Sequence, residues 1–319
     1  MSAEPVIEAR ALRKSFPARG GALKAVDGID LAIQAGEVLG LVGESGSGKT
    51  TAGMTLLQLH EPTSGEILFQ GIGSLKGANR RTLVAFRRQA QIVFQNPYEA
   101  LNPRETVEQA LREPLIIHFP GDKDAQREKM LRAMERAGLI PAETYLSRYP
   151  HQLSGGQLQR VAIARAIALE PRFLVADEPV SMLDVSIRAG ILNLIRRFAS
   201  ELKMAVLYIS HDLSTMRHVC STIAVMYLGR IVEEGPAEQI LDAPLHPYAQ
   251  ALVAAVPMMG GRGKRPRVQL AGAIPNAAEL PPGCRFHPRC PKAFARCREA
   301  EPQLRSIGET RRVACHLYD

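Results

Sequence analysis

Residues 43–50 read Gly-Glu-Ser-Gly-Ser-Gly-Lys-Thr and fit the phosphate-loop pattern G-x-x-x-x-G-K-[ST]. Glycines let such a loop turn its backbone N–H groups inward, where they and the following helix N-terminus attract phosphate. In this motif Lys49 reaches the β- and γ-phosphates, and the Thr50 hydroxyl is a ligand of Mg²⁺. A buried strand expected at residues 38–42 and a helix expected at 50–60 supply the context that the motif requires. A chance glycine-rich turn is therefore disfavoured.

Two acids follow the apolar stretch at residues 173–176, which is typical of a strand buried on both faces. A carboxylate at the end of a buried strand is costly unless a cation faces it. We expect Asp177 to hold Mg²⁺ through water, and Glu178 to orient or activate the attacking water. The competing interpretation is a plain strand end with solvated acids.

A second glycine motif, Leu-Ser-Gly-Gly-Gln, occupies residues 153–157 and precedes a helix expected at 158–169. Ser154 stands where an N-cap is expected, and the two glycines after it allow close approach of phosphate. The chain's own nucleotide is already held at residues 43–50. These donors are therefore predicted to serve a nucleotide on a second chain, in a head-to-tail dimer that closes around ATP. The competing interpretation is an ordinary helix cap.

The order of these motifs resembles the nucleotide-binding subunit of an ABC transporter, over residues 1 to about 240. The resemblance implies that Gln95 touches Mg²⁺ and moves with a helical subdomain, and that His211 contacts the γ-phosphate and Glu178. It implies that Asp184 belongs to a loop crossing to the partner site, although Met182 stands where the family usually has a small residue. Phe16 is expected to stack on adenine, with a packed strand residue as the alternative.

The expected site residues fall into two groups. Catalysis is assigned to Glu178, His211 and Lys49. Contacts with ATP and Mg²⁺ are assigned to Phe16, Gly43, Glu44, Ser45, Gly46, Ser47, Gly48, Lys49, Thr50, Thr51, Gln95, Ser154, Gly155, Gly156, Gln157, Asp177 and Asp184, of which Thr50, Gln95 and Asp177 are the expected Mg²⁺ ligands.

Four of the five cysteines, Cys284, Cys290, Cys297 and Cys315, lie in the last 36 residues. In a reducing compartment, clustered cysteines indicate a metal rather than disulfides. Their spacing lacks the C-x2-C pairs of zinc ribbons. We expect a [4Fe–4S] cluster whose negative charge is balanced by neighbouring basic residues, with zinc or no metal as alternatives. The remaining cysteine, Cys220, is expected to be a small buried hydrophobic residue.

Several phrases resemble the oligopeptide and dipeptide importer ATPases: residues 93–98 (Val-Phe-Gln-Asn-Pro-Tyr), 100–104, 149–151 and 245–248. That resemblance implies a C-terminal extension, which in some members carries a four-cysteine cluster. The cluster is interpreted first as a structural staple and alternatively as a redox sensor.

Strands expected at 173–176, 205–209 and 223–227 alternate with helices expected at about 185–202 and 213–219, which predicts an α/β fold with a mostly parallel sheet. The resemblance implies that this fold is a P-loop NTPase core of the ABC ATPase type with an inserted helical subdomain. We expect an ATPase core at 1–96 and 171–240 that combines RecA-like and antiparallel-β parts. The helical signature subdomain is expected at 97–170. A loop-rich, metal-binding C-terminal extension is expected at 241–319.

Of the net charge of +8, most lies between Gly260 and Asp319, where 12 basic residues face 5 acidic ones. No signal peptide or membrane-spanning stretch is evident, so we expect a peripheral protein at the cytoplasmic face of the inner membrane. The resemblance implies a second ATPase subunit, identical or related, two transmembrane permease subunits and an extracytoplasmic substrate-binding protein. It implies ATP hydrolysis coupled to peptide import, or to nickel or oligosaccharide import. A soluble ATPase acting on nucleic acid or ribosomes is a distant alternative, and no nucleic-acid partner is expected.

Overall fold

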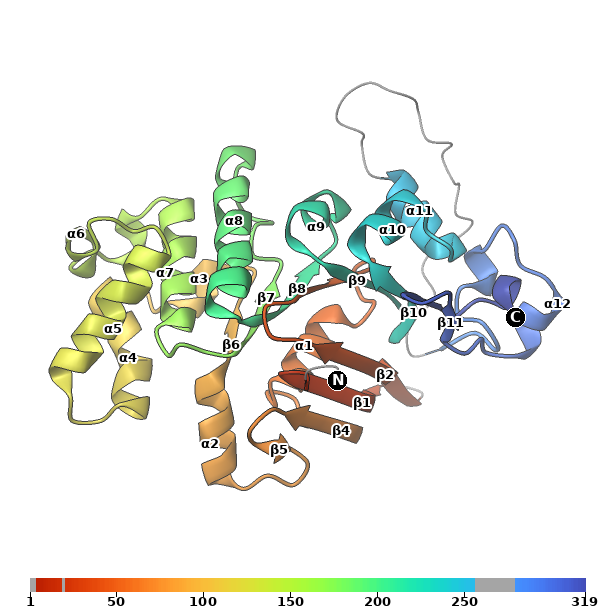
Figure 1. Ribbon diagram of the computed structural model, residues 1–319, viewed down its shortest axis with the longest axis horizontal. Helices are drawn as coiled ribbons and strands as arrows, with labels where there is room; N and C mark the ends of the chain where they lie inside the picture. Colours follow the sequence, from red (N-terminus) through yellow and green to blue (C-terminus); the bar gives the residue numbers. More distant parts are fainter. Residues whose placement is uncertain (1–3, 19–20, 256–278) are drawn as a thin grey trace. The chain divides into compact units, whose positions relative to one another are not determined.

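A computed structural model describes residues 4–18, 21–255 and 279–319 (Figure 1). The chain forms two compact units, each with its own core. The first, called here the helix-rich unit, comprises Met1–Ile7, Ile33–Glu37 and Phe69–Leu207. The second, called the P-loop unit, comprises Glu8–Ala32, Val38–Leu68 and Tyr208–Asp319. The domain boundaries expected from the sequence stay a prediction.

The P-loop unit contains two groups of hydrogen-bonded strands. One has the order β2-β1-β4 and the other the order β11-β12-β10-β9-β3. In the second group β3 and β9 are parallel, whereas β10 is antiparallel to both β9 and β12. The strands are β1 (Ile7–Ala18), β2 (Gly21–Ile33), β3 (Val38–Val42), β4 (Ser64–Phe69), β9 (Thr222–Tyr227), β10 (Arg230–Pro236), β11 (Arg305–Ile307) and β12 (Arg311–Val313).

Helices of the P-loop unit are short, and several follow strands directly (Figure 1). They are α1 (Lys49–Leu56), α9 (Leu213–Val219), α10 (Ala237–Asp242), α11 (Pro247–Ala255) and α12 (Ala295–Glu299), with single 3₁₀ turns η2 (His287–Arg289) and η3 (His316–Tyr318).

The helix-rich unit is built around α4, α5 and α7, which pack against one another in pairs. Leu111, Leu115, Met134, Leu158 and Val161 are fully buried at these helices. The helices are α2 (Arg80–Gln89), α3 (Pro97–Ala100), α4 (Val107–His118), α5 (Lys123–Arg136), α6 (Glu143–Leu146), α7 (Gly155–Ile167) and α8 (Val185–Leu202), with the 3₁₀ turn η1 (Pro150–Gln152). The strands are β5 (Gly73–Ser74), β6 (Ala90–Val93) and β7 (Phe173–Asp177), of which β6 and β7 are parallel.

Most expected elements are confirmed. The strands predicted at 173–176, 205–209 and 223–227 are β7, β8 (Ala205–Ser210) and β9, and the predicted helices at 185–202 and 213–219 are α8 and α9. The helix predicted over 50–60 was too long. It ends at Leu56 because Gln58 has a φ of 55°, in the left-handed region that stops a helix, and the N–H of Leu59 turns back to the Met54 carbonyl oxygen.

Within the three described segments, no helix is both long enough and apolar enough to cross a membrane.

Candidate nucleotide site

The loop from Gly43 to Gly48 joins β3, in which every residue is buried, to helix α1. Gly48 has a φ of 104°, and a Cβ there would overlap the carbonyl oxygen of Ala25. A Cβ at Gly43 would likewise overlap the Met226 carbonyl oxygen. Both positions therefore require glycine, because only a residue without a side chain fits this close backbone approach. The loop fits a phosphate group, since its shape depends on those glycines and α1 begins directly after it.

Lys49 is the first residue of α1, and its side chain is buried in the loop. Its Nζ donates hydrogen bonds to the carbonyl oxygens of Gly43 (2.8 Å) and Glu44 (2.9 Å). The ammonium group is thus held among backbone oxygens inside the turn that the motif predicts. Thr50 and Thr51 follow it in the first turn of α1.

In the helix-rich unit, Asp177 ends β7 and is buried, and Glu178 follows with a φ of 46°. Strand β6 pairs in parallel with β7 so that Val93 lies opposite Ala176. That register brings residues two places further along both strands to the same edge. Gln95 Nε2 accordingly donates a hydrogen bond of 3.0 Å to Glu178 Oε2. The structure therefore joins two residues that the sequence assigned to one site.

Helix α7 begins as predicted, with Ser154 at its N-cap. The Gln157 N–H donates to Ser154 Oγ (3.3 Å), and the Ser154 N–H donates to Gln157 Oε1 (3.0 Å). This reciprocal capping box satisfies two backbone donors at the helix start. A Cβ on Gly156 would lie 2.8 Å from Ile187 Cγ2, whereas one on Gly155 would meet its nearest atom at 3.9 Å. Gly156 is thus also needed for packing against α8.

The remaining predicted residues lie at element ends. Asp184 is the N-cap residue of α8, and its backbone oxygen accepts the N–H groups of Ile187 and Arg188. His211 directly follows β8 and is exposed. Phe16 lies in β1, where its ring meets His60 edge-on at a centroid distance of 5.4 Å and Lys14 Nζ lies 5.0 Å from its centroid. The loop, Phe16 and His211 belong to the P-loop unit.

The predicted metal site is wrong. All four clustered cysteines lie among the described residues, and no group of three or more His, Cys, Asp or Glu side chains in those segments could hold a metal ion. This overturns the [4Fe–4S] cluster and its zinc alternative. Burial raises the pKa of the Cys284 thiol to about 11 and also raises the pKa values of Cys290 and Cys315.

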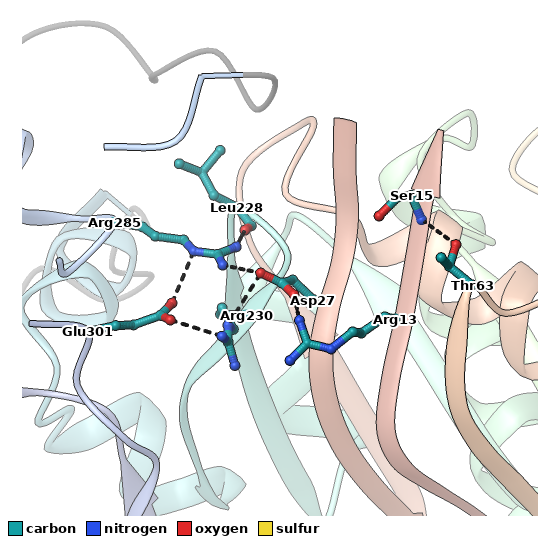
Figure 2. A network of polar contacts seen from close by, with 8 residues as sticks. All are labelled: Arg13, Ser15, Asp27, Thr63, Leu228, Arg230, Arg285 and Glu301. Atoms are coloured by element: carbon teal, nitrogen blue, oxygen red, sulfur yellow. Dashed lines mark hydrogen bonds and ion pairs between the residues drawn. The ribbon is translucent and has the colours of Figure 1, made fainter. Parts of the chain in front are cut away.

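Arg285, one of the basic residues expected to balance a cluster, has carboxylate partners instead. Arg285 forms an ion pair with Asp27 of β2 and donates through Nη1 to the Leu228 carbonyl oxygen at 2.5 Å (Figure 2). Arg230 and Arg285 both bind Glu301, while Arg13 binds the other oxygen of Asp27 (Figure 2). The charge of Arg285 is therefore matched by acids of this chain. Cys220, in contrast, is confirmed as a buried hydrophobic residue.

Sequence reasoning missed two residues that hold the phosphate loop, Tyr248 and Arg289. The Glu44 N–H donates to Tyr248 Oη at 2.8 Å, and the Glu44 carboxylate is bound by Arg289. No local pattern indicates either contact, because both partners lie more than 200 residues further along the chain.

Comparison with known proteins gives two family matches. The model described as "ABC transporter" matches residues 26–181, and the model described as "Oligopeptide/dipeptide transporter, C-terminal region" matches residues 232–297. The oligopeptide transport ATP-binding protein AppF of Bacillus subtilis is 43% identical, with 99% of this chain and 98% of that protein covered. The dipeptide transport ATP-binding protein DppF of Escherichia coli is 44% identical, with 99% and 95% covered.

Among solved structures, the dimeric MJ0796, a bacterial ABC transporter cassette, is 29% identical with a TM-score of 0.65, covering 72% of this chain and 98% of that one. The cbiO1 structure from Clostridium perfringens is 27% identical with a TM-score of 0.67, covering 76% and 92%. These likenesses confirm the α/β fold of an ATP-binding cassette.

Fold and phosphate loop together define an ABC-type ATPase, which couples ATP hydrolysis to transport. More narrowly, the chain belongs to the ABC transporter family in its oligopeptide/dipeptide branch.

Proposed function

We propose that this chain is the ATP-hydrolysing subunit of an importer for dipeptides or oligopeptides. The observation that carries the proposal is the identity of 43–44% along nearly the whole chain with ATP-binding proteins of peptide transport. That identity includes the C-terminal region, which has its own match to oligopeptide/dipeptide transporters.

The assembly proposed for it places two ATPase subunits head to tail, identical or related, below two permease subunits that form the path. An extracytoplasmic protein would deliver the peptide. The similarity to a cassette solved as a dimer supports the pairing. We place the chain at the cytoplasmic face of the inner membrane as a peripheral subunit.

In the proposed site, Lys49, Thr50 and the backbone of residues 43–50 hold the phosphates of ATP, and Thr50, Gln95 and Asp177 hold Mg²⁺. The metal neutralises charge on the phosphates when bound. Phe16 supports the adenine ring. The glycine-lined start of α7, from Ser154 to Gln157, completes the nucleotide site of the partner subunit. Asp184 belongs to the loop that crosses to that partner site.

The attacking water is assigned to Glu178, with His211 assisting. The hydrogen bond from Gln95 Nε2 to Glu178 Oε2 supports this assignment, because the amide holds one carboxylate oxygen in a defined position. Gln95 also begins the segment that leads from β6 into the helices of its unit, so a change at the carboxylate can be transmitted to them.

A transport assay tests the function. A strain lacking this chain receives wild-type protein, Lys49→Ala, Glu178→Gln or, as a matched control, Lys76→Ala, an exposed lysine outside the loop. We expect wild type and Lys76→Ala to restore uptake of labelled dipeptides and tripeptides, and the other two to fail. Uptake of nickel or an oligosaccharide in place of peptides would contradict the proposed substrate. If the strain lacking this chain still takes up all of these substrates, the importer function itself is contradicted.

A further inference from the structure

Glu44, the second residue of the phosphate loop, is held on two sides by residues that follow the core strands. Arg289 Nη1 donates to Glu44 Oε2 at 2.6 Å, and Arg289 Nη2 donates to Glu44 Oε1 at 3.1 Å. The Glu44 N–H donates to Tyr248 Oη at 2.8 Å. Both the backbone and the side chain of this loop residue are therefore bound by the C-terminal part of the same unit.

An aromatic cluster fixes those two partners. Tyr248 is fully buried, with its ring centroid 4.6 Å from that of Tyr227 and 5.4 Å from that of Phe286. Phe286 is also buried, and its carbonyl oxygen accepts the N–H of Arg289 at 3.0 Å. Arg289 thus extends from a 3₁₀ turn whose position is set by packed rings, with only 7% of its side chain exposed. A guanidinium held in this way meets the carboxylate with little further loss of conformational freedom.

The charge of Glu44 makes this contact relevant to ATP. A phosphate loop binds an anion through N–H groups and one lysine, and a bare carboxylate in the loop would repel that anion. Glu44 is partly exposed, at 24% of its side chain, so its charge is not removed by burial. A two-pronged Arg–carboxylate pair neutralises the carboxylate and fixes its direction.

We propose that Arg289 is a positioning residue for the ATPase reaction, acting through Glu44 on the shape and charge of the phosphate loop. The C-terminal region thereby sets the affinity of the chain for ATP. The inference rests on the proposed function only in taking ATP hydrolysis at this loop as the reaction.

The test compares Arg289→Ala, Arg289→Lys, Glu44→Gln and the double variant Arg289→Ala/Glu44→Gln in the assembled transporter. Arg298→Ala, an exposed arginine of the same region, is the control. We expect Arg289→Ala to raise the KM for ATP about tenfold, as loss of a charge-assisted hydrogen bond does. The kcat should stay within about twofold, since Arg289 does not touch the reacting atoms. The KM of Arg289→Lys for ATP should lie between those of the wild type and Arg289→Ala, because an ammonium keeps the charge but cannot form the two-pronged contact.

The double variant separates positioning from general support of the fold. Removing the Glu44 charge should restore most of the ATP affinity lost in Arg289→Ala, because no bare carboxylate then remains in the loop. An unchanged KM in Arg289→Ala, or a double variant no better than the single one, would overturn the proposal. Should Arg289→Ala not fold, the KM of Arg289→Lys relative to Arg298→Ala decides. If the transporter carries another substrate but these KM shifts are still observed, only the proposed peptide function is contradicted.

Discussion

At the scale of single residues, the contact between Gln95 and Glu178 concentrates the proposed chemistry at one edge of two parallel strands. Glu178 occupies a backbone conformation with φ of 46°, which non-glycine residues adopt rarely and which is common at functional sites. The carboxylate is thus directed by both its backbone and its hydrogen-bond donor.

Replacing Glu178 with Gln tests that direction. The amide keeps the shape of the side chain but cannot accept a proton, so we expect ATP hydrolysis to fall by about 100-fold or more while ATP still binds. Phosphate release and binding of a fluorescent ATP analogue measure the two effects. Gln91→Ala, a glutamine of β6 that bonds to the Arg87 carbonyl oxygen, is the control. Hydrolysis near the wild-type rate would remove Glu178 from the reaction.

At the scale of elements, the start of α7 combines a cap with a tight helix contact. Ser154 and Gln157 close the helix N-terminus, and Gly156 lets Ile187 of α8 approach. A larger residue at 156 would have to displace that side chain or separate the two helices.

We therefore expect Gly156→Ala to destabilise the chain by about 1–3 kcal/mol, the usual cost of overpacking. Gly155→Ala is the matched control, because a Cβ there has 3.9 Å to its nearest neighbour. The melting temperature measures both. Ile187→Ala combined with Gly156→Ala should recover part of the loss, and equal melting temperatures for the two single glycine variants would refute the contact.

At the scale of the whole molecule, ion pairs bind the C-terminal region to strands of its own unit. Asp27 of β2 is buried among Arg13, Arg230 and Arg285 (Figure 2). Burial by itself raises the pKa of this carboxyl, but the hydrogen bond and charge of Arg285, with the charges of Arg230 and Arg13, leave the pKa below its ordinary value. The charged form is therefore the one that the folded state favours.

A pH dependence follows from that direction. Because the folded-state pKa is depressed, the stabilisation is fully present above about pH 4 and is lost as the pH falls through the folded pKa. We expect Asp27→Asn to melt at a lower temperature near neutral pH, where it loses about 1–3 kcal/mol, and to show a shallower decline on acidification. Melting curves at stepwise lower pH compare it with Glu309→Gln, a control at an exposed carboxylate. Parallel pH profiles for wild type and Asp27→Asn would contradict the linkage.

Local patterns predicted the parts of this protein that depend on neighbours in sequence. The glycines of residues 43–50, the N-cap at Ser154 and the apolar runs of β7, β8 and β9 all act over a few residues, so their meaning is present in the chain itself. The register of β6 and β7, in contrast, depends on pairing between segments that are distant in sequence. The sequence therefore assigned Gln95 and Glu178 to one site but did not predict the hydrogen bond between them.

The sequence by itself therefore determined the α/β class, the phosphate loop and the order of the motifs. Tertiary structure alone decided what the C-terminal arginines and cysteines do. Arg285 meets Asp27 across 258 residues and Arg289 meets Glu44 across 245, and no periodicity or spacing encodes such contacts. The sequence interpretation placed these charges around a metal, because clustered cysteines and arginines suggest one. Folding instead pairs Arg285 with Asp27 and Arg289 with Glu44, since a carboxylate that is wholly or partly buried is stable only where a cation lies beside it.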